Sequence, residues 1–365
     1  MGENAGKVMT VLGPVNPEEL GHTLPHEHTL TYLTYYATQS SDPEVAAEFK
    51  KPVTLDNLYM ALNDFYCIED NCIIQDKEFL IKELKRFKAA GGGTVCDLTL
   101  EDITKYRGAN DEHYRNVKEL SERSGVHIVC SVGDYVSDVH LPRVKELTVE
   151  QLAQVYIDTI NNGFGTSGVK PGQVGELGVG NDFNEDEHKV LAAGVIACKE
   201  TGLSMNVHIN SNTFRNDFSI LDWLEEHGMD LTRVGLSHRD ATLANKAHTF
   251  EESLLHLEKL MDRGAYVLFD SCGNLSLETA PYAQWANPSD RDRAIALRKL
   301  IDRGYNKQLM LSMDASQRHR YTSYGGYCYT HILKRFREWC KFYDITDAEY
   351  EQMIVKNPQT LLTIK

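Results

Sequence analysis

The stretch TLPHEHTL, residues 23–30, places two histidines one residue apart inside a short apolar run near the start of the chain. Because side chains alternate across a β-strand, His26 and His28 point to one side of it and Glu27 to the other. Two imidazoles on the buried side of a strand must either be satisfied by hydrogen bonds or face a cation. The rest of the chain distinguishes these alternatives.

A repeated unit follows this stretch: an amphipathic helix, a glycine, and then a short apolar strand. A capping residue followed three positions later by an acid or amide predicts the start of a helix. Four such pairs are Thr148 and Gln151, Asn184 and Glu187, Thr249 and Glu252, and Ser289 and Asp292. Glycines that are expected to end helices are Gly125, Gly202, Gly264 and Gly304.

Eight strands are predicted, at residues 23–28, 92–100, 126–135, 172–180, 203–210, 233–240, 265–273 and 308–316. Apolar strands that alternate with helices are typical of a parallel sheet covered by helices, and eight units favour a closed (β/α)8 TIM barrel. Residues 8–24 predict an N-terminal β-hairpin of two apolar pieces joined by a Pro/Asn turn. The connection at 30–75 is expected to add helix and a loop over the barrel mouth. Residues 1–365 are therefore expected to form a single domain.

The net charge of −15, without a basic run, argues against nucleic acid as a partner. The chain has eight scattered cysteines and no CxxC pair, as expected of reduced thiols. The first residues, MGENAGKVMT, lack the apolar region of a signal peptide, and no apolar stretch is long enough to span a bilayer. These features predict a cytoplasmic protein that does not associate with a membrane.

Polar residues stand where five of the predicted strands end: His26 and His28, Glu176, His208, His238, and Asp314. In a (β/α)8 barrel the carboxyl ends of all strands meet at the face that carries the active site. Taken alone, each residue could be a rim residue or a helix cap. Four histidines and two carboxylates converging on one end would be costly to bury without compensation, which a divalent cation supplies. Imidazole and carboxylate without thiolate suit Zn²⁺, and Mn²⁺, Fe²⁺ and Co²⁺ accept the same ligands.

These residues carry a family resemblance. The stretch GHTLPHEH at 21–28, with the later His208, His238 and Asp314, resembles the phosphotriesterase family of the amidohydrolase superfamily. The segments GTS at 165–167, GELG at 175–178 and YGGY at 324–327 are most similar to the phosphotriesterase-related branch. The similarity extends over essentially the whole chain, including the NPQTL ending at 357–361.

The resemblance implies two divalent metal ions, one bound by His26, His28 and Asp314 and the other by His208 and His238. Many members bridge the two ions with a carboxylated lysine at the end of the fourth strand, where this sequence has Glu176. The rival bridging residue, Lys170, precedes Pro171 and Gly172 and is expected to lie outside the strand. Glu176 is therefore the expected bridging ligand.

Asp314 is also expected to be catalytic, because a carboxylate beside a metal-bound hydroxide can accept its proton and pass it to the leaving group. In the family that the chain resembles, a histidine after the seventh strand often relays this proton, and this sequence has no histidine there. Asp270, at that position, is left either as its replacement or as a structural cap.

Four residues are expected near the barrel mouth as substrate contacts: His22, Tyr135, Arg239 and Tyr324. Arg239 follows a candidate ligand directly and would favour an anionic small-molecule substrate. The leading hypothesis is a hydrolase in which a metal-bridging hydroxide attacks an ester, lactone or phosphoester. The alternatives are an amidohydrolase of small N-acyl amino acids or N-acyltaurine, and a non-catalytic binding barrel. The resemblance also implies a homodimer.

Overall fold

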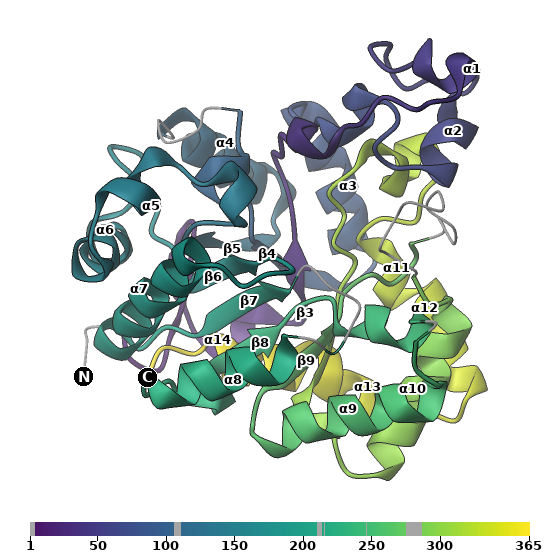
Figure 1. Cartoon of the computed structure of the whole chain (residues 1–365). Helices are drawn as coiled ribbons and strands as arrows, with labels where there is room; N and C mark the ends of the chain where they lie inside the picture. The colour runs from purple at the N-terminus through teal and green to yellow at the C-terminus, as the bar shows by residue number, and fades with distance from the viewer. Residues whose placement is uncertain (1–3, 106–110, 210–213, 215, 246, 275–286) are drawn as a thin grey trace.

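The structure is a computed structural model that describes residues 4–105, 111–209, 214, 216–245, 247–274 and 287–365. Eight parallel strands lie in sequence order around a barrel, and helices cover its outside (Figure 1). The strands are β3 His22–Glu27, β4 Gly92–Asp97, β5 His127–Val132, β6 Gln173–Val179, β7 Met205–Ile209, β8 Val234–Leu236, β9 Tyr266–Phe269 and β10 Leu309–Leu311. The predicted (β/α)8 fold is confirmed.

The barrel is nearly closed between its first and last strands. The amide of Asp314 donates to the carbonyl of His26 over 3.3 Å, and the hydroxyl of Ser312 donates to the same carbonyl over 2.7 Å. The side chains of the strands are almost all buried, as expected for a sheet covered on both faces.

The helices begin where the capping pairs predict. Thr148, Asn184, Thr249 and Ser289 each accept a hydrogen bond from the amide three residues ahead. The helices are α1 Pro43–Ala46, α2 Leu58–Asn63, α3 Lys77–Ala89, α4 Asp111–Ser124, α5 Pro142–Glu146, α6 Val149–Asn162, α7 Glu185–Thr201, α8 Asp217–Glu226, α9 Phe250–Asp262, α10 Asp290–Asp302, α11 Thr330–Leu333, α12 Arg335–Phe342, α13 Asp347–Glu351 and α14 Asn357–Leu362.

The N-terminal hairpin is present, but its turn is not where the sequence suggested. Strand β1 (Val8–Thr10) pairs with β2 (Gly13–Val15) around Val11 and Leu12. Pro14 lies within β2, and Asn16 caps the following 3₁₀ turn rather than forming the hairpin turn. The predicted Pro/Asn turn was therefore wrong, because Pro14 belongs to the second strand of the hairpin and Asn16 to the element that follows it.

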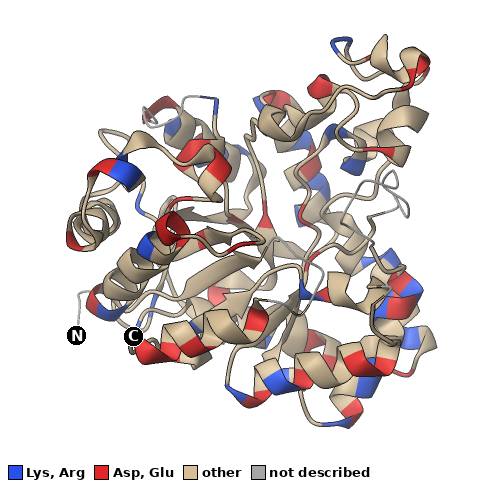
Figure 2. Ribbon diagram, in the orientation of Figure 1, with Lys and Arg blue, Asp and Glu red and all other residues tan. Residues whose placement is uncertain are grey.

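The long first connection carries α1 and α2 and extends to one side of the barrel (Figure 1). Lysine, arginine, aspartate and glutamate residues lie mainly on the covering helices and loops, and few lie on the strands (Figure 2). Among the helices in the described part of the chain, none has the length and apolarity needed to cross a membrane.

Candidate active site

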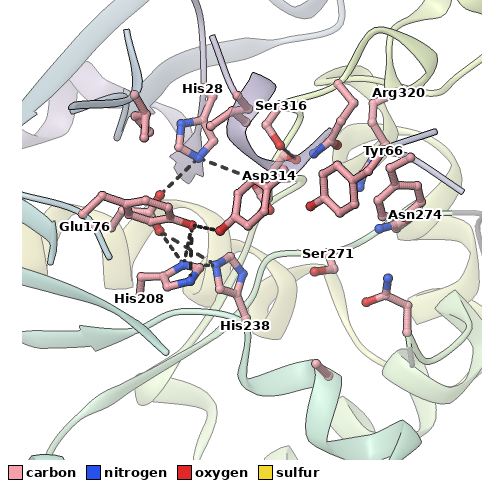
Figure 3. A pocket seen from close by; sticks show the side chains of 18 of the residues that line it. His28, Tyr66, Glu176, His208, His238, Ser271, Asn274, Asp314, Ser316 and Arg320 are labelled. Carbon is pink, nitrogen blue, oxygen red and sulfur yellow. Dashed lines mark hydrogen bonds and ion pairs between the residues drawn. The ribbon is translucent and has the colours of Figure 1, made fainter. Parts of the chain in front are cut away.

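The six candidate ligands meet at the carboxyl end of the barrel, as Figure 3 shows for five of them. We call His26, His28, Glu176, His208, His238 and Asp314 the His/acid cluster. His238 and Asp314 lie two and three residues after the ends of β8 and β10 and have left-handed backbones, with φ of 60° and 47°. Such a conformation is costly for a residue with a side chain and is typical of functional sites. The two left-handed residues are thus both positions where a ligand is expected.

Glu176 lies at the centre of the cluster. Its Oε1 atom is 3.3 Å from Nε2 of His28. Its Oε2 atom is 3.4 Å from Nε2 of His26, 3.1 Å from Nδ1 of His208 and 3.8 Å from Nε2 of His238. Oε1 thus faces His28 and Oε2 faces the other three histidines, so one carboxylate lies close to all four histidines of the cluster.

The cluster fits a divalent cation on two observations. The Nε2 atom of His26 is buried and has no hydrogen-bond partner in the described structure, which is unfavourable unless another group binds it. Ligand atoms within 4.8 Å of one another occur in two groups, His26 with His28 and Asp314, and His26 with Glu176 and His238. Imidazole nitrogens and carboxylate oxygens at this spacing could hold one or more ions.

Asp270 is fully buried next to the cluster and does not line the pocket. One of its oxygens is 2.9 Å from Nδ1 of His238, and the other is 3.0 Å from Nδ1 of His26. It also accepts the backbone amide of His238. A carboxylate behind a ligating imidazole sets the tautomer and orientation of the ring. Asp270 therefore positions two candidate ligands, which favours a structural role over the proton relay.

Hydroxyl groups contact the Nδ1 ring nitrogens of His26 and His28. Ser237 contacts Nδ1 of His26 at 2.8 Å, and Thr99 contacts Nδ1 of His28 at 3.1 Å. Glu27, on the opposite side of β3, accepts from the hydroxyl of Ser312 and from the amides of Met313 and Ala315. It thus fixes the chain on both sides of Asp314, as expected for a carboxylate that is not itself a ligand.

The electrostatics of the cluster favour ionised carboxylates. Burial lowers the pKa of an imidazole, but nearby carboxylates outweigh burial at His28, where the pKa rises to about 9, and at His238, where Asp270 raises it to about 10. Burial dominates at His208 and lowers its pKa to about 4. Burial would raise the pKa of Glu176, but the surrounding imidazoles, His26 above all, lower it well below its usual value.

A pocket of about 370 Å³ opens above the cluster. The first connection contributes an aromatic wall, and the loops after β9 and β10 contribute a polar wall. Pocket residues outside the cluster are Leu33, Tyr36, Thr38, Asp64, Phe65, Tyr66, Ile103, Tyr135, Ala241, Ser271, Asn274, Asn287, Ser316, Gln317 and Arg320. Asp314 is 24% exposed at the side chain, against 1% for Glu176, so it presents an oxygen to this space.

Of the four expected substrate contacts, only Tyr135 lines the pocket. Its hydroxyl lies 3.2 Å from a ring nitrogen of His208. His22 lies at the opposite end of β3, where it contacts the carbonyl of Gly91 and the carboxylate of Glu351. Its expected place at the barrel mouth was wrong, because it begins the strand instead of ending it.

Arg239 and Tyr324 are also placed elsewhere. Arg239 is fully buried behind the cluster, where Nη1 pairs with Asp217 at 2.6 Å. The hydroxyl of Tyr324 accepts from Arg318 on a 3₁₀ turn outside the pocket lining. Lys170 precedes the start of β6 at Gln173 and so lies at the other end of the strand from the cluster.

Arg320 is the one basic residue among the described pocket residues that the sequence analysis did not identify. It lies six positions after Asp314 in the loop that follows β10 and is 4% exposed. A cation in that loop was a detectable signal, but Arg318 and His319 stand beside it. Nothing in the pattern distinguishes which of the three faces inward.

The comparisons with known proteins agree with this geometry. The sequence profile of the phosphotriesterase family matches residues 6–362. The N-acetyltaurine hydrolase of Xenopus tropicalis is 32% identical over 367 residues, covering all of both chains.

Solved structures share the fold. A resiniferatoxin-binding protein from Rhodobacter sphaeroides superposes with a TM-score of 0.90 at 27% identity, covering 99% of this chain and 96% of that one. A lactonase from Listeria monocytogenes superposes with a TM-score of 0.75 at 20% identity, covering 98% and 99%. The family match over nearly the full length, together with relatives named as hydrolases, identifies this chain as a hydrolase that belongs to the phosphotriesterase family.

Proposed function

We propose that this protein is a binuclear metal-dependent amidohydrolase that cleaves the acyl group from a small N-acylated amine bearing an acid, of the N-acetyltaurine type. The full-length similarity to N-acetyltaurine hydrolase carries the proposal. The convergence of the His/acid cluster beneath a small pocket supports it.

The ligands divide between two ions. His26, His28 and Asp314 would hold the first, and His208 and His238 the second, with Glu176 between them through its two oxygens. Zn²⁺ suits this set of nitrogen and oxygen ligands. When bound, such ions polarise a carbonyl oxygen and lower the pKa of a coordinated water from about 15.7 toward about 7.

The side chains of the protein supply the proton transfers. Burial would raise the pKa of Asp314, but the hydrogen bond with His28 and the nearby imidazoles of His26 and His238 together outweigh burial and lower the pKa, so the carboxylate is ionised and can accept a proton. An amine leaves well only when protonated, and Asp314 is the cluster acid with an oxygen open to the pocket. The hydroxyl of Tyr135, next to His208, can orient the acyl oxygen.

A second candidate is the hydrolysis of an ester or lactone. The position of Asp270 favours this candidate. Its carboxylate is engaged with His26 and His238, so it cannot serve as a second acid that protonates a leaving group. An alcohol leaving group depends less on an acid than an amine does.

A substrate panel tests both proposals. The panel contains N-acetyltaurine, N-acetyl amino acids, p-nitrophenyl esters, lactones and phosphoesters, each assayed after the addition of Zn²⁺ or Mn²⁺. Turnover of the amides above the esters is the expected result, with a larger loss for amides than for p-nitrophenyl esters in Asp314→Asn. Turnover of esters or lactones alone would reject the amidase proposal.

A further inference from the structure

Four arginines in the described part of the chain are buried: Arg233, Arg239, Arg293 and Arg320. Arg239 pairs with Asp217, and Arg293 pairs with Asp240, each at 2.6 Å. Arg233 donates to three backbone carbonyls. Arg320 is the one of these four that lines the pocket.

The hydrogen bonds of Arg320 leave part of its guanidinium unused. Its Nη2 donates to the carbonyls of Cys272 and Met313, and its Nε is buried without a partner. It forms no ion pair with any carboxylate among the described residues, although Asp314 and Glu27 lie near enough to affect its pKa. A buried guanidinium without an anionic partner is costly, and an anion that binds in the pocket would offset this cost.

The surroundings of Arg320 suit an anion. Ser271, Asn274, Asn287 and Gln317 line the same pocket and are neutral side chains able to donate hydrogen bonds. Figure 3 shows Arg320 on the side of the pocket where Tyr66 and Asn274 lie, away from Glu176. A small molecule could therefore place one end at the His/acid cluster and the other at Arg320.

The overall charge of the pocket does not provide this attraction. Asp64 also lines it, and its carboxylate accepts the amide of Tyr66. With Asp64, Glu176 and Asp314 present, and the whole chain at −15, an anion needs a specific cationic partner. Among the described pocket residues, Arg320 is the one arginine and there is no lysine.

We propose that Arg320 determines substrate specificity by binding the sulfonate or carboxylate of the substrate while the scissile bond lies at the His/acid cluster. This inference rests on the proposed function for the bond that is cleaved, but the anion site can be tested separately. A guanidinium offers two parallel N–H donors to a sulfonate or carboxylate, and its charge strengthens both hydrogen bonds.

The test compares Arg320→Met and Arg320→Lys with the matched control Arg233→Met, which removes a buried arginine that has only carbonyl partners. The kcat and KM are measured for N-acetyltaurine, N-acetyl-β-alanine and the neutral N-(2-hydroxyethyl)acetamide. We expect Arg320→Met to lower kcat/KM for the two anions about 100-fold, mainly through KM, and to leave the neutral amide nearly unchanged. The ratio between sulfonate and carboxylate identifies the preferred anion.

Arg320→Lys keeps a positive charge. It should lower kcat/KM for the anionic substrates, relative to the neutral amide, about tenfold, and it serves as the test if Arg320→Met does not fold. The control Arg233→Met should lower the melting temperature without changing the preference. Equal losses for the anionic and neutral substrates in the Arg320 variants would show that Arg320 only stabilises the loops after β9 and β10, through its hydrogen bonds to Cys272 and Met313. That result, or no loss at all, would overturn the proposal.

Binding separates this inference from the proposed function. N-acetyltaurine and the neutral amide are titrated into the purified full-length protein and into Arg320→Met by calorimetry. If wild type binds N-acetyltaurine more tightly than the neutral amide, Arg320→Met does not, and neither protein hydrolyses it, the anion site is supported and the amidase is rejected. Hydrolysis of N-acetyltaurine without any difference in binding between the two proteins would reject the anion site and keep the amidase.

Discussion

At the scale of single residues, the cluster depends on side chains that do not face the pocket. Asp270 holds His26 and His238 through separate oxygens, and Glu27 fixes the backbone around Asp314. In His26, His28 and His238, Nδ1 is thus engaged by Asp270 or Thr99 and Nε2 is left toward the centre of the cluster. This arrangement prepares the rings to bind a cation without reorientation.

Asp270→Asn should therefore weaken metal binding about 10- to 100-fold, because an amide cannot accept from both rings as a carboxylate does. The measurement is the metal content after dialysis against a chelator of graded concentration. Asp217→Asn is the matched control, since Asp217 is an equally buried carboxylate that pairs with His256 and Arg239 outside the cluster. Equal loss of metal in both variants would mean that general destabilisation causes the effect.

Glu176→Gln should abolish the binding of at least one ion, because it removes the charge from the oxygens that face both halves of the cluster. Lys170→Ala should retain the metal, since Lys170 precedes β6 at its far end. Metal analysis of the two purified variants shows whether Glu176 or Lys170 is the metal ligand. Retention in Glu176→Gln with loss in Lys170→Ala would reverse the assignment.

The sequence predicts the cluster better than the pocket, for a physical reason. Residues at the ends of barrel strands share one face, so His208 and Asp314 could be brought together from their positions alone. Loop residues have no such constraint. Arg239 seemed to face the mouth because it follows His238, but the left-handed turn at His238 directs the next residue behind the sheet, where Asp217 pairs with it.

At the scale of elements, local hydrogen bonding made the helix starts predictable. The N-cap residues of α6, α7, α9 and α10 satisfy amides that would otherwise lack partners, so their positions follow from a few neighbouring residues. The hairpin turn was not predictable in this way. Pro14 is compatible with an edge strand as well as with a turn, and only the pairing of β1 with β2 distinguishes them.

Asp290 joins three elements at the start of α10. Its carboxylate accepts from the amide of Gly273 at 2.9 Å, from Arg293 at 3.2 Å and from His331 at 2.6 Å. Burial would raise the pKa of Asp290, but these partners outweigh burial and lower the pKa to about 2. The pKa of Asp290 is lower in the folded than in the unfolded chain, which means that folding stabilises its ionised carboxylate. Asp290 therefore stabilises the fold at neutral pH.

Asp290→Asn should therefore lower the free energy of unfolding by about 2 kcal/mol at pH 7, at about 1.4 kcal/mol for each unit of pKa shift. The difference from wild type should be complete above about pH 4 and disappear as the pH falls through about 2. Urea unfolding at several pH values measures it. Asp222→Asn, which removes an acid that is 63% exposed and pairs with Arg263, should cost less than about 1 kcal/mol. A difference for Asp290→Asn that persists at pH 2 would contradict this account.

At the scale of the whole molecule, the fold was the most predictable property. Eight repeats of helix and apolar strand have few arrangements that bury every strand on both faces, so the period of the pattern predicts the barrel. Such a barrel brings ligands from β3, β6, β7, β8 and β10 to one site, although they lie nearly 290 residues apart in the chain. The stability of the folded chain should therefore depend on what the cluster binds.

If the cluster binds metal as we propose, protons and metal ions should compete for it. Without metal, the pKa of His28 is about 9 and that of His238 about 10, so both imidazoles are protonated at pH 7. The raised pKa values of His28 and His238 mean that their protonated rings stabilise the metal-free fold. This stabilisation is complete below about pH 6.5 and is lost as the pH rises through 9 and 10. A metal ion binds the neutral imidazoles, so its affinity should rise about tenfold for each proton displaced and each unit of pH.

Melting temperatures with saturating Zn²⁺ and with chelator should consequently diverge as the pH rises from 6 to 9. Calorimetric titration in two buffers of different ionisation enthalpy should show proton release on metal binding at pH 7. His238→Asn should reduce the number of protons released, and His256→Asn, which alters a buried histidine outside the cluster, should not. A gap between the two melting curves that is constant with pH would show that the cluster is not protonated before metal binds.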